Sequence, residues 1–212
     1  MAALDFYAGL EGDNSRSYWL AHREDYDRYV RAPTVALLEE LRPKYGSFHL
    51  FRPNRDVRFS RDKSPYKTAM AAVTEGDGGE HYYLQLSTEG LFVGVGLYHM
   101  TADQLARYRE AVDDSRAGPM LRRSVEALTA KGFSIGGERL KTAPRGYPRD
   151  HPRIELLRHK GMYASKAYAP AAWLATRGCV SRITKAWDTA APLSTWLARH
   201  VGPSTEPPWE GR

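Results

Sequence analysis

The chain has 212 residues, enough for one domain or a compact pair, and 42% of them are hydrophobic and 26% charged. This composition is typical of a globular protein and excludes a disordered chain, a collagen-like repeat and a disulfide scaffold. Lysine and arginine exceed aspartate and glutamate by six, so the formal net charge is +6.

The N-terminal region, residues 4–42, predicts helices. A short first helix ends before Asn14, a residue type that caps helices well. Beyond it, aromatic and apolar side chains recur at helical spacing. We expect two helices here that meet near Ala32 and are ended by Pro43 and Gly46, because proline and glycine interrupt helices.

Strand patterns follow at residues 69–74, 82–87 and 91–98. The last two are separated by a short turn that ends in glycine, which predicts a β-hairpin. Gly94 and Gly96 lie two residues apart, on the same face of the second strand. They indicate either a bulge or a face that another backbone or a ligand approaches closely.

The rest of the chain returns to helical patterns after residue 100, with a break at Gly118. A short strand is expected within 132–140, then a loop rich in proline and glycine over 142–152, and a last helical region over 173–197. Helices at both ends of a hairpin-built sheet predict an α+β fold, with a mainly antiparallel sheet covered by N- and C-terminal helices.

The domain organisation follows from the same patterns. We expect a single domain over residues 1–201 and a disordered tail over 202–212, where proline and glutamate are frequent. Neither a secretory signal nor an apolar run of membrane-spanning length is visible, so we expect a cytoplasmic protein. The one cysteine, Cys179, is predicted to be a small buried apolar residue.

The positive charge is concentrated in two segments. Residues 52–67 carry six bases and two acids, and residues 139–160 carry seven bases and two acids. Together these segments exceed the net charge of the whole chain, so the basic character is local. A local excess of cations is what an anion-binding surface requires.

The first basic segment offers groups for binding and for proton transfer. Arginine can bind a phosphate or carboxylate with two parallel hydrogen bonds, and lysine supplies a point charge. The candidate ligand-binding residues of this segment are Arg55, Arg58, Lys63, Tyr66 and Lys67. Asp56 and Asp62 are candidate catalytic or orienting groups. The alternative is that these acids and bases pair with one another and hold an irregular loop in place.

The second basic segment contains a stiff loop. Its prolines and glycine restrict the backbone and would hold Arg145 and His151 in defined positions. Arg145 is a candidate ligand-binding residue, and His151 is a candidate catalytic acid or base. We hypothesise that this loop lies beside the first basic segment, so that both form one cationic pocket with Gly94 and Gly96 at its floor.

Several known site patterns are missing from the sequence. It has no His-Glu-x-x-His motif and no paired cysteines, so we predict no metal. It has no phosphate-binding loop, dinucleotide-binding motif or nucleophile elbow, so we predict no cofactor.

The first basic segment also resembles a known family signature. Residues 55–67 read Arg-Asp-Val-Arg-Phe-Ser-Arg-Asp-Lys-Ser-Pro-Tyr-Lys. This run is similar to the signature of an uncharacterised bacterial and fungal family catalogued as domain of unknown function 2461. Asn14-x-Arg16-x-x-Trp19 and a segment over 141–152 agree with the same family. The resemblance implies a single α+β domain and brings no activity with it.

The combined patterns lead to one functional hypothesis and one alternative. We expect the chain to bind a small anionic molecule with phosphate or carboxylate groups in a basic pocket, and the sequence leaves open whether it is an enzyme. The alternative is a module that binds nucleic acid or an acidic partner protein, since the basic segments are interleaved with aromatic residues. No membrane partner is expected.

Overall fold

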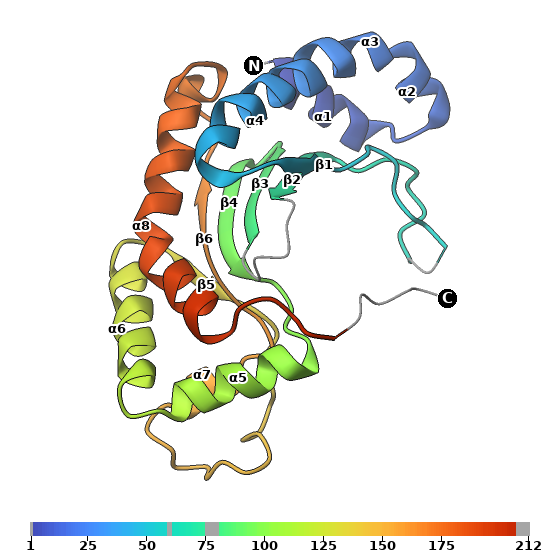
Figure 1. Cartoon of the computed structure of the whole chain (residues 1–212). Helices are drawn as coiled ribbons and strands as arrows, with labels where there is room; N and C mark the ends of the chain where they lie inside the picture. Colours follow the sequence, from blue (N-terminus) through green and yellow to red (C-terminus); the bar gives the residue numbers. More distant parts are fainter. Residues whose placement is uncertain (1, 59–60, 75–80, 207–212) are drawn as a thin grey trace. The chain divides into compact units, whose positions relative to one another are not determined.

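The structure is a computed structural model, and it describes residues 2–58, 61–74 and 81–206. Helices lie at both ends of the chain and antiparallel strands lie between them, so the fold is α+β, as predicted (Figure 1). The chain forms two compact units. The first unit comprises Met1–Glu75, Tyr83–Val93 and Ala167–Lys185, and the second comprises Gly76–Tyr82, Gly94–Lys166 and Ala186–Arg212.

Six strands form one sheet. They are β1 (Phe48–Leu50), β2 (Ala69–Thr74), β3 (His81–Ser87), β4 (Gly90–Leu97), β5 (Ser134–Gly136) and β6 (Met162–Tyr168). Their order in the sheet is β1-β2-β3-β4-β6-β5, so the predicted hairpin is present as β3 and β4. The register pairs Ala72 with Leu84, and both side chains are fully buried. Alternate residues of β2 are buried, as the strand period of two requires.

Gly96 allows β4 and β6 to approach closely. Its φ of +134° is one that other residues rarely adopt, and a Cβ at this position would collide with the Met162 carbonyl oxygen. The sequence left open a bulge, the approach of another backbone or the approach of a ligand. At Gly96 the structure shows the approach of another backbone, that of β6.

The first unit carries the N-terminal helices. They are α1 (Ala2–Gly12), α2 (Arg16–Ala21), α3 (Arg23–Asp25), the π-helix η1 (Tyr26–Arg31) and α4 (Ala32–Tyr45), and a 3₁₀ turn, η2 (Ala172–Ala175), belongs to the same unit. Helix α1 packs along η1 (Figure 1). The Ser15 hydroxyl caps α2 by accepting from the Tyr18 N–H at 3.1 Å. Helix α4 begins at Ala32, as expected, and ends at Gly46, whereas Pro43 lies inside its last turn.

Aromatic rings form the core between these helices. Phe6 of α1 contacts Trp19 and Tyr26, with ring centroids 6.0 and 5.6 Å apart, and Trp19 contacts Tyr26 at 4.9 Å. All three side chains are less than a tenth exposed. Tilted and edge-to-face aromatic pairs add to the stabilisation gained from burial. The cluster thus holds α1, α2 and η1 together.

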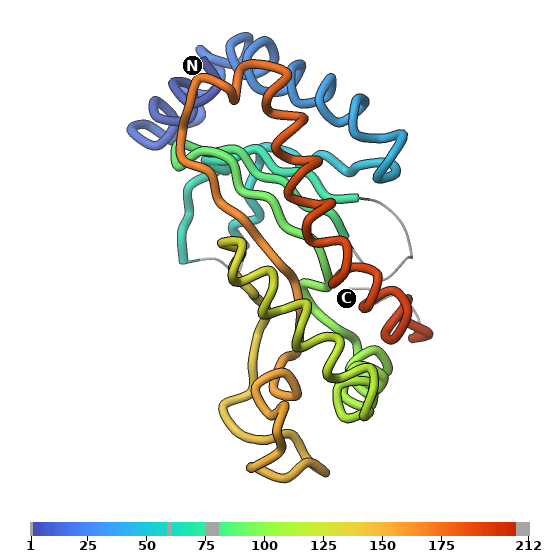
Figure 2. The backbone as a smooth tube through the Cα atoms, turned by 90° about the vertical axis from the view of Figure 1, so that its left-hand side faces the viewer, coloured from blue at the N-terminus to red at the C-terminus, as the bar shows by residue number. Residues whose placement is uncertain are grey.

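The second unit contains the other helices. They are α5 (Ala102–Asp113), α6 (Ala117–Ala130), α7 (Ile154–Leu157) and the second part of α8 (Gly178–His200). Helices α5 and α7 lie side by side, with the chain between β5 and α7 next to them (Figures 1 and 2). The buried Tyr108 hydroxyl donates to the Leu156 carbonyl at 2.9 Å, and Trp196 Nε1 donates to the Ala117 carbonyl at 2.9 Å. Both buried polar groups are therefore satisfied.

Part of the tail that we expected to be disordered lies within the described residues. Residues 202–206 are hydrogen-bonded to α5, where Arg107 donates to the Pro203 carbonyl at 2.7 Å and Asp103 accepts from the Thr205 N–H at 2.8 Å. Residues 207–212 lie outside the described part. Cys179 is buried, as predicted, and burial raises the pKa of its thiol. None of the described helices has the length and apolar character needed to cross a membrane.

Candidate functional site: a basic cavity

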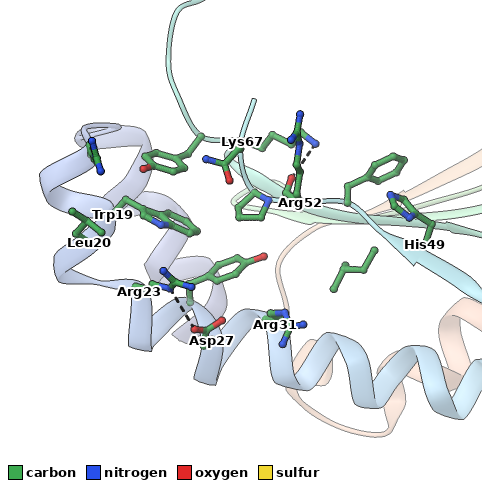
Figure 3. Close-up of a pocket in the computed structure, with 15 residues that line it drawn as sticks. Trp19, Leu20, Arg23, Asp27, Arg31, His49, Arg52 and Lys67 are labelled. Atoms are coloured by element: carbon green, nitrogen blue, oxygen red, sulfur yellow. Dashed lines mark hydrogen bonds and ion pairs between the residues drawn. The ribbon is translucent and has the colours of Figure 1, made fainter. Parts of the chain in front are cut away.

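A cavity of about 1050 Å³ lies in the first unit, between its helices and the chain that follows β1 (Figure 3). Its helical side is formed by Arg16, Trp19, Leu20, Arg23, Tyr26, Asp27 and Arg31. Its strand and loop side is formed by His49, Leu50, Phe51, Arg52, Pro53, Asn54, Tyr66 and Lys67. We refer to the space bounded by these residues as the basic cavity.

The lining has a large excess of positive charge. Its cations are Arg16, Arg23, Arg31, Arg52 and Lys67, against one carboxylate. That carboxylate, Asp27, lies 3.9 Å from Arg23, and both side chains are more than half exposed. Such an exposed pair is weak. The cavity therefore has cationic donors from both of its sides, and Figure 3 shows Arg23 and Arg31 on the helical side and Arg52 and Lys67 on the other.

Tyr66 is fixed as a wall of the cavity by two residues of the N-terminal region. Asn14 Oδ1 accepts from the Tyr66 N–H at 2.9 Å, and Asn14 Nδ2 donates to the Tyr66 carbonyl at 3.1 Å. The Trp19 ring stacks on the Tyr66 ring with centroids 4.4 Å apart and planes 12° apart. Tyr66 is only 6% exposed. The start of α2 is thus joined to a segment some fifty residues away in the sequence.

Backbone pairing fixes the positions next to Tyr66. Asn54 and Tyr66 form an isolated antiparallel bridge, with hydrogen bonds from the Lys67 N–H to the Pro53 carbonyl at 2.8 Å and from the Arg55 N–H to the Pro65 carbonyl at 2.9 Å. The described residues 54–58 and 61–66 therefore form the two sides of a hairpin-like loop. Its base faces the cavity, which places Asn54 and Lys67 in the lining.

The π-helix η1 places two of its residues in the cavity. Its last hydrogen bond runs from the Ala32 N–H to the Asp27 carbonyl, five residues back. In an α-helix, Tyr26 and Arg31 would be separated by roughly 140° around the axis. In a π-helix, residues five apart lie about one turn above one another, and both line the cavity. Burial raises the pKa of Tyr26, although the Arg31 charge acts in the opposite direction.

Lys67 is the half-buried cation of the lining. Its Nζ donates to the Arg52 carbonyl at 3.0 Å and lies 5.2 Å from the centroid of the Phe51 ring. Burial lowers the pKa of Lys67, and the charges of Arg52 and Arg55 lower it further.

Comparison with protein families matches residues 2–196 to the family described as "Conserved hypothetical protein (DUF2461)". The chain belongs to this family. The matched range includes every residue that lines the basic cavity. No curated protein matches the chain, and no solved structure matches it.

Most of the candidate residues of the first basic segment lie in the outer part of the loop in this DUF2461 chain. Arg55 forms an ion pair with Asp62, which also accepts from the Ser64 N–H at 2.9 Å. Asp56 accepts from Arg58 Nε at 3.0 Å and Nη2 at 2.7 Å, and these hydrogen bonds lower the pKa of Asp56 to about 2.

Lys63 lies away from the cavity, where it donates to the Val57 carbonyl at 2.9 Å within the loop. Two other candidates reach the cavity. Of the five candidate ligand-binding residues between 55 and 67, only Tyr66 and Lys67 are in the described lining of the basic cavity.

The two candidates from the second basic segment belong to the second unit. Arg145 is exposed. His151 Nδ1 accepts from the Arg153 N–H at 3.0 Å, so its Nε2 carries the proton that is shared with Asp113 at 2.9 Å. The Nε2 of His151 therefore holds the loop to the end of α5, whereas its Nδ1 makes a hydrogen bond within the loop. That this loop and the first basic segment form one pocket stays a prediction.

Sequence reasoning missed several residues of this family member's cavity: Arg16, Arg23, Arg31, His49, Arg52 and Asn54. Arg16 is part of the family motif, and Arg52 belongs to the first basic segment, so both carried a signal. Arg23 and Arg31 flank Asp27 at a spacing of four, a pattern typical of a solvated helix face. In the described residues, no group of three or more His, Cys, Asp or Glu side chains is arranged to hold a metal ion.

Proposed function

We propose that the chain binds a small anionic molecule, with phosphate or carboxylate groups, in the basic cavity. The observation that carries the proposal is the charge of the lining, where five cationic side chains face one exposed carboxylate around a hollow of about 1050 Å³. An anion in this position would relieve the repulsion between these cations, of which Arg23 has a weak, exposed ion pair with Asp27.

The chemistry of the lining favours phosphate or carboxylate over other anions. Arginine presents a planar set of donors that matches the oxygens of these groups. The four arginines of the lining are exposed, so their side chains can turn toward a ligand; they are Arg16, Arg23, Arg31 and Arg52. The volume is near the upper end of the range of about 300–1000 Å³ found for small-molecule sites, which suits a metabolite-sized ligand.

Aromatic and apolar walls support an organic ligand rather than a bare inorganic ion. Trp19, Tyr26 and Tyr66 are held rigidly by their contacts with one another and with Phe6, and Leu20 and Leu50 also line the cavity. Rigid aromatic surface next to cationic donors is the usual composition of a site that binds both the carbon skeleton and the charged groups of a ligand.

The test is binding of inorganic phosphate, pyrophosphate and citrate, measured by calorimetry and by the shift in melting temperature. Arg31→Ala should weaken binding about tenfold, the loss expected for one charge-assisted hydrogen bond. Arg28→Ala is the matched control, because Arg28 lies on the same π-helix, outside the lining, over the Tyr29 ring. Equal losses in both variants, or no binding by the unaltered chain, would contradict the proposal.

The alternative, nucleic acid or an acidic partner protein, predicts a different salt dependence. Neutralisation of several phosphates makes log affinity fall steeply with log salt concentration. A single-stranded oligonucleotide should therefore be titrated at two salt concentrations beside the small anions. A steep slope for the oligonucleotide, with weak binding of small anions, would favour the alternative.

A further inference from the structure

Lys67 lines the basic cavity, and its contacts differ from those of Lys160. Lys160 forms an ion pair with Glu138 at 2.6 Å, whereas the Nζ of Lys67 contacts a backbone carbonyl and the face of an aromatic ring. Lys166 also contacts a backbone carbonyl, that of Lys131, and an aromatic ring, that of Phe133, but it lies outside the described lining of the cavity. Within the described part of the chain, no carboxylate lies at ion-pair distance from Lys67. In the described residues, the ammonium form of Lys67 is therefore stabilised by a carbonyl oxygen and a ring face rather than by a carboxylate.

Burial and neighbouring cations lower the pKa of Lys67 and so increase the share of neutral amine. The side chain is half-buried, and its nearest charged neighbours, Arg52 and Arg55, are cations. Desolvation and adjacent cations are the two means by which proteins convert a lysine into a nucleophile. The neutral amine can still donate to the Arg52 carbonyl, which would hold Nζ in place while its lone pair stays available.

The same cavity can hold the anionic part of a reactant. Arg16, Arg23 and Arg31 belong to the helical side of the lining. Figure 3 shows Arg23 and Arg31 across the cavity from Arg52 and Lys67. A ligand with an anionic group bound by these arginines would place the remainder of its skeleton against the aromatic walls. Lys67 lies in that lining, where it can meet a carbonyl carbon of such a ligand.

We infer that Lys67 is a nucleophilic amine that forms an imine with a carbonyl-bearing anion in the basic cavity, an inference that rests on the proposed function. The amine nitrogen attacks the carbonyl carbon and a C–N bond forms. The C–O bond then breaks, and the oxygen leaves as water with the two protons of the amine. The step is a condensation and needs neither an oxidant nor a reductant. The bound anion keeps its charge throughout and stays with the arginines.

Pyridoxal 5′-phosphate is a suitable probe, because it joins an aldehyde to a phosphate. The full chain is incubated with it at pH 7.5, reduced with borohydride, digested and analysed by mass spectrometry. Lys63 is the matched control, because it lies on the exposed part of the same loop, outside the cavity. Lys67 should be labelled severalfold faster than Lys63, because its lowered pKa leaves more free amine and the cavity would hold the phosphate of the probe. Excess inorganic phosphate should slow labelling of Lys67 and leave Lys63 unchanged.

The variant Lys67→Arg separates this inference from the proposed function. It keeps the positive charge but cannot form an imine, so it should still bind phosphate and show no labelling at position 67. If Lys67 in the unaltered chain is labelled no faster than Lys63 while phosphate still binds, the inference is wrong and the proposed function stands. If phosphate neither binds nor protects, the proposed function fails with it.

Discussion

Asn14 joins the two sides of the basic cavity at the scale of a single side chain. Its side-chain amide accepts from the Tyr66 N–H and donates to the Tyr66 carbonyl, as a neighbouring strand would. Lys67 follows directly in the chain, and its position depends on the same backbone. The rigidity of the cavity wall therefore depends on one amide that lies just before a helix start.

Replacing this amide should destabilise the fold and loosen the cavity. Asn14→Ala leaves the Tyr66 N–H and carbonyl without partners, and we expect a loss of about 1–3 kcal/mol in the free energy of unfolding. Phosphate binding should weaken as well, because Lys67 loses its anchor. Urea denaturation and calorimetry measure the two effects. Ser17→Ala is the control: its exposed hydroxyl shares a hydrogen bond with the Ser15 hydroxyl, so its effect should stay within about 0.5 kcal/mol. An Asn14→Ala chain as stable as the control would refute this role.

The sequence separation between interacting residues explains which parts of the site could be predicted from the sequence. The ion pairs of the outer loop join residues close in sequence, such as Asp56 and Arg58. The alternation of acids and bases in the sequence already suggested this pairing as the alternative to ligand binding. The cavity joins groups that lie far apart, such as Asn14 and Tyr66. Their proximity depends on tertiary folding, which spacing along the chain does not encode.

At the scale of elements, segments with a strong hydrophobic pattern could be predicted from the sequence, whereas segments with a weak pattern could not. The β3–β4 hairpin and the start of α4 at Ala32 were predicted correctly, because long apolar runs and a proline in the first turn mark them. Strand β1 has three residues, and β6 reads Met-Tyr-Ala-Ser-Lys-Ala-Tyr, without a β-branched side chain. The π-helix η1 has no sequence signature comparable to a cap or a proline.

The contact between α5 and the residues that follow α8 includes one carboxylate, that of Asp103. Hydrogen bonds from the Thr101 hydroxyl, and also from the Thr205 N–H and the Ser204 hydroxyl, hold the pKa of Asp103 well below its ordinary value of 3.8. A depressed pKa in the folded state means that Asp103 stabilises the fold above pH 3.8 and loses this contribution as the pH falls below it. Acid should therefore release residues 202–206 from α5.

Hydrogen exchange of residues 202–206 tests this contact. Asp103→Asn should speed exchange there at pH 7, because the charged acceptor for Thr205 is lost. The difference in melting temperature between this variant and the unaltered chain should shrink as the pH is lowered from 6 to 3. Asp150→Asn, an exposed carboxylate of the loop before α7, serves as the control. A difference that is constant across this pH range would exclude the proposed role of the carboxylate.

At the scale of the whole molecule, the chain passes several times between its two compact units. Four elements, β3, β4, β6 and α8, contribute residues to both units. No single cut in the chain can therefore separate one unit from the other. Domains that unfold independently are normally joined by exposed linkers with few contacts, rather than by shared strands and helices. We therefore predict that the two units behave as one domain.

A single domain should unfold in one cooperative transition. Leu41 in the first unit and Leu121 in the second are both fully buried, so Leu→Ala at either position should cost about 2–5 kcal/mol. If the units are one cooperative domain, each substitution should lower the urea midpoint in both units equally. Hydrogen exchange at increasing urea, resolved by peptide, reports each unit separately. A midpoint that moves only in the substituted unit would show two independent domains, because destabilisation then stays where the cavity was made.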